Sequence, residues 1–319
     1  MTPPLFDRRS IPAAAREARW SAPDGHAVRR IDWDAAPGAR PRGSILFLPG
    51  RGDFYEKYLE TLDGWSMHGW RVTASDWRGQ AGSGRMSADP LIGDIADFAV
   101  WIDDLAALWQ EWQAQTPAPH VLIGHSMGGH LILRALAERR VNPAAMVLSA
   151  PMLGFVSAIP AVIQHLASRL MCRIGNPARA AWKSSEKPGS SVSGRAELLT
   201  FDPGRYEDEM WWRGARPELL IGPASWRWVE RAAASVAALN APGVLEAVNT
   251  PVLLLAARRD QLVTWRAIER AAQRLPRGEL VSWGAEARHE LLREADSVRD
   301  AVLRAIEVFL ARAELARTD

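Results

Sequence analysis

Short runs of apolar residues alternate along the chain with longer segments in which apolar residues recur every three or four positions. The short runs are rich in valine, isoleucine and leucine, as in strands buried on both faces of a parallel sheet. They predict strands at 44–49, 71–75, 120–124, 146–150, 252–256 and 280–283. The periodic segments predict amphipathic helices at 54–67, 95–113, 127–140, 265–275 and 297–313. This alternation favours an α/β fold with a mostly parallel, doubly wound sheet.

A hairpin is expected ahead of the first parallel strand. An extended segment ends near Trp20, a second one covers 28–33, and Pro23-Asp24-Gly25 lies between them. Proline, aspartate and glycine supply the backbone geometry of a tight turn. The hairpin would extend the sheet by antiparallel strands at one edge.

The alternation stops after residue 150, and no convincing strand follows until about Ala241. We interpret this stretch as an inserted helical unit and divide the chain into residues 1–150 (first part of the core), 151–228 (insertion) and 229–319 (second part of the core). Within the insertion, four apolar residues at helical spacing predict a helix: Ile159, Ile163, Leu166 and Leu170. Pro160 is compatible with the first turn of that helix.

The composition is that of an ordinary globular protein, with 48% hydrophobic and 24% charged residues. Only three of the 39 basic residues are lysine, and the arginines are dispersed rather than gathered in the stripe that nucleic-acid binding needs. The single Cys172 excludes an intramolecular disulfide, and no Cys/His pattern indicates a metal site. Neither a secretory signal nor an apolar run of ~18 residues is present, so we expect a cytoplasmic protein.

The strongest chemical signal is the pentapeptide Gly124-His125-Ser126-Met127-Gly128. It follows the predicted strand at 120–124 and precedes the predicted helix at 127–140. A Gly-x-Ser-x-Gly motif between a strand and a helix is typical of a nucleophile elbow, in which a tight turn presents the serine at the edge of the sheet. Ser126 is therefore the predicted nucleophile.

A serine nucleophile needs a histidine that takes its proton and a carboxylate that orients the histidine. Of the seven histidines, only His289 follows the last predicted strand. Asp260 comes shortly after the predicted strand at 252–256, which gives the chain order serine, acid, histidine. We predict Asp260 as the acid, with Glu286 as the next candidate.

Acyl transfer also requires two backbone N–H groups that stabilise an oxyanion. One comes from the residue after the nucleophile, Met127, and the other from the loop after the first parallel strand. In Pro49-Gly50-Arg51-Gly52-Asp53 we predict the Arg51 N–H as this second donor and the Gly50 N–H as the alternative.

Several motifs together resemble the α/β-hydrolase superfamily and, more narrowly, the bacterial lysophospholipase and monoacylglycerol lipase group. The likeness extends from about Ala18 to Ala311 and rests on 49–52, 76–85, 124–129, 150–154 and 288–290. Two loops depart from the usual pattern. Pro49 stands where relatives often have histidine, and Trp77 and Ala81 stand where histidine and glycine are usual.

The resemblance implies a serine ester hydrolase that acts on a single-acyl lipid, a lysophospholipid or a monoacylglycerol, through an acyl-enzyme and without a metal or organic cofactor. It also implies that residues 151–228 form a lid over an acyl pocket, for which Met152, Phe155, Ile159 and Ile163 are the candidate lining residues. The helical stripe is equally typical of plain core.

Four tryptophans in or beside the end of the insertion suit either interior packing, which we favour, or a transient contact with the inner membrane surface: Trp211, Trp212, Trp226 and Trp228.

Other functions remain open on the sequence. A proline-type aminopeptidase would need a lid carboxylate for the substrate amine, for which Glu207, Asp208 and Glu209 are candidates, although a solvated acidic face explains them more simply. Acyl transfer to an alcohol would use the same catalytic residues. A non-catalytic ligand-binding protein is a further alternative, although such proteins usually lack a member of the triad. The sequence leaves the acyl length, the head group and the oligomeric state open.

Overall fold

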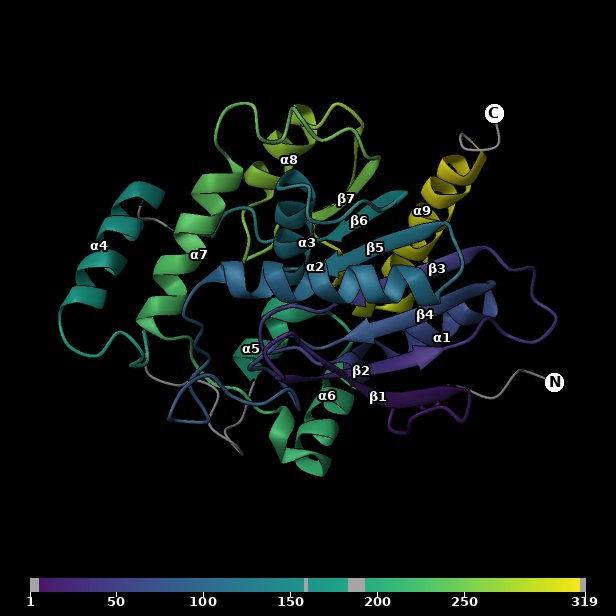
Figure 1. The fold of residues 1–319 in the computed structure, drawn as a ribbon, viewed down its shortest axis with the longest axis horizontal. Helices are drawn as coiled ribbons and strands as arrows, with labels where there is room; N and C mark the ends of the chain where they lie inside the picture. Colours follow the sequence, from purple (N-terminus) through teal and green to yellow (C-terminus); the bar gives the residue numbers. More distant parts are fainter. Residues whose placement is uncertain (1–5, 158–159, 183–192, 316–319) are drawn as a thin grey trace.

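A twisted sheet of eight strands runs through the part of the chain that the computed structural model describes, residues 6–157, 160–182 and 193–315 (Figure 1). Its strand order is β1-β2-β4-β3-β5-β6-β7-β8. The strands are β1 (Ala15–Ser21), β2 (Ala27–Trp33), β3 (Gly43–Leu48), β4 (Trp70–Ser75), β5 (His120–His125), β6 (Ala145–Ser149), β7 (Val252–Ala257) and β8 (Gly278–Trp283). From β4 to β8 all neighbours are parallel, which confirms the predicted fold class.

The predicted hairpin is formed by β1 and β2, and β2 pairs antiparallel with β4. The turn between them closes through a hydrogen bond from the Ala22 N–H to the His26 carbonyl. Gly25 has a φ of 83°, a conformation that glycine adopts without steric cost. The hairpin therefore forms the antiparallel edge of the sheet.

Helices cover both faces of the sheet, and each face has its own apolar core (Figure 1). On one face lie α2 (Phe98–Gln115), α3 (Met127–Ala137) and α8 (Trp265–Arg274), and on the other lie α1 (Leu59–Met67) and α9 (Asp296–Leu315). Neighbouring residues of one strand point to opposite cores: Leu46 belongs to the first core and Phe47 to the second. Burial on both faces explains the continuous apolar runs in the sequence.

The described residues between β6 and β7 form four α-helices: α4 (Ala161–Arg173), α5 (Ser193–Leu199), α6 (Pro203–Ala215) and α7 (Trp226–Leu239). The expected boundary at Trp228 falls in the first turn of α7. Helix α6 contributes Trp212 to the second core, whereas α4 lies against α7 at the outer end of the molecule (Figure 1). Within the described ranges, no helix is long and apolar enough to cross a lipid bilayer.

Candidate active site

Ser126 forms the turn between β5, which ends at His125, and α3, which begins at Met127. Its backbone has φ 51° and ψ −117°, a conformation that a residue with a side chain rarely adopts. The turn also needs Gly128, because a Cβ atom there would lie 2.3 Å from the Leu48 carbonyl oxygen at the end of β3. The Gly-x-Ser-x-Gly motif is thus a strained turn packed against the neighbouring strand.

Asp260 and His289 lie in direct contact. The His289 Nδ1 atom is 2.6 Å from the Asp260 Oδ2 atom, and both side chains are buried. The other Asp260 oxygen accepts hydrogen bonds from the N–H groups of Leu262 and Val263, at 2.7 and 3.1 Å. Because these bonds fix the carboxylate on both sides, it can orient the imidazole ring.

The Asp260–His289 pair lies beside the serine turn. The ring centroids of His289 and of His125, the residue before Ser126, are 4.8 Å apart. The structure therefore gathers the three predicted residues at the carboxyl ends of β5, β7 and β8, where ligands of open α/β sheets bind. Their catalytic roles stay predictions.

The electrostatics of the pair suit a general base. Burial alone would lower the pKa of His289, but the Asp260 carboxylate raises it above its usual value, with smaller contributions from Glu290 and Asp53. Burial alone would raise the pKa of Asp260. However, His289 and the two backbone N–H donors hold the pKa of this carboxyl below its usual value. Burial lowers the pKa of the neighbouring His125 to about 4, which keeps that ring neutral near pH 7.

The loop after β3 packs against the serine turn. A Cβ atom on Gly50 would lie 3.1 Å from the Ser126 Cβ atom. The N–H of Gly50 donates to Asp53 Oδ2 at 3.1 Å, and the N–H of Gly52 donates to Gln80 Oε1 at 2.6 Å. These bonds fix the backbone on both sides of Arg51, the predicted oxyanion donor.

The two departures from the relatives' pattern meet at this loop. Trp77 Nε1 donates to the Pro49 carbonyl oxygen at 2.8 Å, so the unusual tryptophan supports the unusual proline. Ala81 has a φ of 45°, which explains why glycine is usual at its position. The Gln80 side chain also approaches the Met127 sulfur at 4.0 Å and so connects both predicted oxyanion segments.

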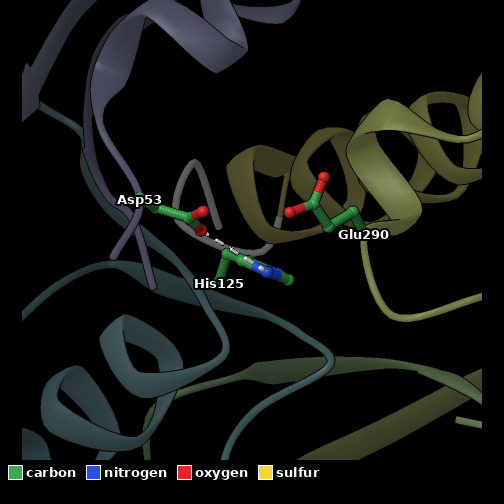
Figure 2. Close-up of side chains that lie close together, drawn as sticks. All are labelled: Asp53, His125 and Glu290. Carbon is green, nitrogen blue, oxygen red and sulfur yellow. Dashed lines mark ion pairs between the residues drawn. The ribbon is translucent and has the colours of Figure 1, made fainter. Parts of the chain in front are cut away.

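Asp53, His125 and Glu290 form a cluster that no sequence motif reveals. Figure 2 shows the two carboxylates facing each other from opposite sides, with the His125 ring below them. Their ligand-type atoms lie within 4.8 Å of one another, as in a metal site. However, the Lys57 ammonium lies 2.5 Å from Asp53 Oδ1 and 2.5 Å from Glu290 Oε1, so a protein cation already occupies this place.

The four predicted pocket residues have different surroundings. The buried Met152 donates its N–H to the Ser126 carbonyl oxygen at 3.0 Å, and Phe155 pairs with Val263 beside the Asp260 loop. These two residues therefore lie close to the predicted triad. Ile163, on α4, is 54% exposed, and Ile159 lies outside the described residues.

Two of the three acidic residues proposed for amine binding are engaged by protein cations. Asp208 pairs with Arg8 and Arg9, both at 2.6 Å. Glu209 is buried and pairs with Lys57 at 2.9 Å and with Arg213 at 2.8 Å. Glu207 is exposed. The interpretation of these residues as a solvated acidic face is therefore wrong for Asp208 and Glu209, because both carboxylates form ion pairs with protein cations.

The four tryptophans considered for packing or membrane contact differ in burial. Trp212 and Trp228 are buried, as the interior-packing interpretation expects, and Trp212 Nε1 donates to the Arg8 carbonyl oxygen at 2.8 Å. Trp226 is half-buried, while Trp211 is 41% exposed.

Comparison with known proteins assigns the chain to a family. Residues 39–296 match the family described as serine aminopeptidase, S33. Lysophospholipase L2 of Escherichia coli strain K12 is 29% identical over 306 residues, which cover 93% of this chain and 87% of the relative. The probable lysophospholipase L2 of Haemophilus influenzae is 27% identical over 283 residues, covering 86% and 85%.

Among solved structures, a soluble variant of the monoglyceride lipase of Saccharomyces cerevisiae, in complex with a substrate analogue, has a TM-score of 0.72 at 17% identity. The similarity covers 98% of this chain and all of that one, and it shows the shared fold. The resemblance to lysophospholipases and monoacylglycerol lipases is thus confirmed. The chain belongs to the serine aminopeptidase S33 family, and it is a serine hydrolase with the α/β-hydrolase fold.

Proposed function

We propose that this protein hydrolyses the acyl ester of a single-acyl lipid, a lysophospholipid or a monoacylglycerol. The observation that carries the proposal is the strained Ser126 turn with the buried Asp260–His289 pair beside it. The substrate class is supported by the relatives named lysophospholipase L2, which match the chain over most of its length. No metal or organic cofactor is needed for this chemistry.

In the proposed mechanism, the Ser126 hydroxyl oxygen attacks the ester carbonyl carbon while His289 takes the hydroxyl proton. The N–H groups of Met127 and Arg51 stabilise the resulting oxyanion. His289 then returns the proton to the departing alcohol, which leaves an acyl-enzyme on Ser126. A water molecule attacks the acyl-enzyme while His289 takes its proton. His289 then returns this proton to the Ser126 oxygen as the acyl–oxygen bond breaks, which releases the fatty acid and restores the enzyme.

Helix α4 supports action at a lipid surface. Five large apolar residues on or just after α4 are more than half exposed: Val162, Ile163, Leu166, Leu170 and Ile174. Arg169 and Arg173 lie on the same helix, which contains no acidic residue. Exposed apolar residues beside arginines are suited to the interface of a membrane with anionic lipids. We infer a transient contact of α4 with such a surface during substrate uptake.

The test is hydrolysis of a panel of monoacylglycerols, lysophospholipids, p-nitrophenyl esters and aminoacyl anilides, combined with fluorophosphonate labelling. We expect the highest kcat/KM with single-acyl lipids and covalent labelling at Ser126. A preference for aminoacyl anilides would replace the proposal by the peptidase alternative. Failure of the label to attach to Ser126 would support a non-catalytic ligand-binding protein.

A further inference from the structure

Lys57 is one of only three lysines in the chain, and its side chain is fully buried. It lies on the short helix η1 (Tyr55–Tyr58) that follows the loop after β3. Three carboxylate oxygens surround its ammonium nitrogen: Asp53 Oδ1 at 2.5 Å, Glu290 Oε1 at 2.5 Å and Glu209 Oε2 at 2.9 Å. An ammonium group has three N–H donors, so one lysine can satisfy all three carboxylates.

Each of these carboxylates belongs to a different part of the proposed catalytic machinery. Asp53 also accepts the N–H of Gly50 and so fixes the oxyanion loop. Glu290 directly follows His289 and therefore fixes the loop that carries the base. Glu209 lies on α6 of the insertion. Three segments far apart in the sequence thus meet at one nitrogen atom.

The remaining contacts of the cluster make its geometry rigid. Tyr58 donates its hydroxyl to Asp53 Oδ2 at 2.9 Å, and Arg293 pairs with both Glu290 and Glu209. Asp53 and Glu290 project from opposite loops toward each other (Figure 2). Their oxygens lie within 4.8 Å of each other. Without a cation between them, two buried carboxylates this close would repel each other. The Lys57 ammonium supplies positive charge between the two loops.

We propose that Lys57 is a positioning residue that holds the oxyanion loop, the His289 loop and helix α6 in their catalytic arrangement. This proposal rests on the proposed function. Lys57 does not contact substrate and would act only by positioning Gly50, His289 and α6. Oxyanion stabilisation and proton transfer act in the transition state, so loss of Lys57 should lower kcat far more than it changes KM.

The charges that face His289 set a second expectation. The carboxylates of Asp260, Glu290 and Asp53 favour its protonated form, the buried His125 is neutral, and Lys57 compensates the charge of Glu290 and Asp53. Arg293 and Glu209 complete the surroundings. Removing the ammonium while both carboxylates stay should stabilise the imidazolium and move the acid limb of the kcat/KM profile to higher pH.

The experiment compares Lys57→Met with the double variant Lys57→Met/Glu209→Gln. The single variant leaves one buried negative charge uncompensated and is at risk of unfolding. The double variant removes one charge of each sign and keeps Asp53 and Glu290 without their shared ammonium. Asp104→Asn is the control, because Asp104, on α2, forms a buried ion pair with Arg78, in the loop after β4, at 2.6 Å.

For each variant, we would measure kcat, KM, the kcat/KM pH profile and the melting temperature. We expect the double variant to fold, to lose about tenfold or more in kcat at nearly unchanged KM, and to move its acid limb to higher pH. Asp104→Asn should keep the wild-type kcat and the wild-type acid limb. A wild-type kcat and limb in the folded double variant would overturn the proposal, and so would an equal loss of kcat in Asp104→Asn. Failure of the proposed function shows separately, as wild-type protein that the fluorophosphonate does not label at Ser126.

Discussion

Ser126 combines a functional side chain with an unfavourable backbone conformation. Its φ of 51° lies in the left-handed region, where only glycine is free of steric cost. The surrounding structure holds the turn through bonds at the Ser126 backbone: its N–H donates to the Ser149 carbonyl, and its carbonyl accepts from His130 and Met152. Strain of this kind is kept where the turn presents a side chain for reaction.

The first prediction separates the role of the Ser126 hydroxyl from this strain. Both Ser126→Ala and Ser126→Gly should lose about 10⁴-fold or more in kcat, because the nucleophile is absent. Ser126→Gly should also be more stable than Ser126→Ala by about 1 kcal/mol, since glycine relieves the positive φ. Ester hydrolysis and denaturant unfolding measure the two effects. Retention of a tenth of the wild-type kcat by either variant would exclude Ser126 as the nucleophile.

The second prediction concerns the pH dependence that Asp260 imposes on His289. Only neutral imidazole accepts a proton, so activity should rise with pH through a pKa above the ordinary histidine value. In Asp260→Asn the attraction of the carboxylate for the imidazolium is lost and burial dominates. The acid limb of the kcat/KM profile should therefore move to lower pH, and kcat should fall about 10⁴-fold. The kcat/KM profile of both proteins tests this, with Glu286→Gln as the control. An unchanged rate in Asp260→Asn would assign the acid to Glu286.

The sequence could reveal Ser126, Asp260 and His289 because their signals are local. Each of them follows a predicted strand, and parallel strands end at one edge of the sheet. The Lys57 cluster has no such signal, since Lys57 and Glu290 are 233 residues apart and meet only through the folded backbone. Long-range pairing of buried charges leaves no spacing pattern, so this half of the site needed the structure.

At the scale of single elements, helix α4 shows what periodicity can and cannot predict. The spacing of Ile163, Leu166 and Leu170 correctly predicts a helix, which runs from Ala161 to Arg173. It does not indicate what the apolar side faces, and these three side chains are exposed rather than packed in a core. An apolar helix face specifies only that some apolar partner is favourable, whether protein or lipid.

The third prediction tests whether that partner is a lipid surface. In Ile163→Asp/Leu166→Asp, kcat/KM for vesicle-bound single-acyl lipids should fall about tenfold or more, because the helix loses apolar area and gains charges that anionic lipids repel. Hydrolysis of p-nitrophenyl acetate and the melting temperature should stay near wild type, since both residues are more than half exposed.

The matched control for this variant is Met67→Asp/Val308→Asp, which changes two exposed apolar residues on α1 and α9. It should hydrolyse vesicle-bound lipid at the wild-type rate. Equal losses on soluble and vesicle-bound substrates, or a collapse of thermal stability, would show that Ile163 and Leu166 belong to the packed protein.

At the scale of the whole molecule, helices α6 and α4, both between β6 and β7, are attached to the rest of the chain in different ways. The first half of α6 is joined to other parts of the chain by ion pairs: Arg205 pairs with Glu60 and Asp296, Asp208 with Arg8 and Arg9, and Glu209 with Lys57 and Arg293. Helix α4 packs against α7, at the outer end of the molecule (Figure 1). We therefore expect α6 to complete the catalytic centre and α4 to contact substrate or membrane.

The fourth prediction follows from this difference in attachment. Native-state hydrogen exchange near pH 7 should show α6 amides at least about 100-fold more protected than α4 amides, a difference of about 2.7 kcal/mol in opening free energy. The difference should persist in about 0.5 M salt, because the Glu209–Lys57 and Glu209–Arg293 pairs are buried and screened weakly. The core helix α3 provides the reference for global opening. Equal protection of α4 and α6 would mean that the insertion opens as one unit, and substrate entry would then disturb the Lys57 cluster at each turnover.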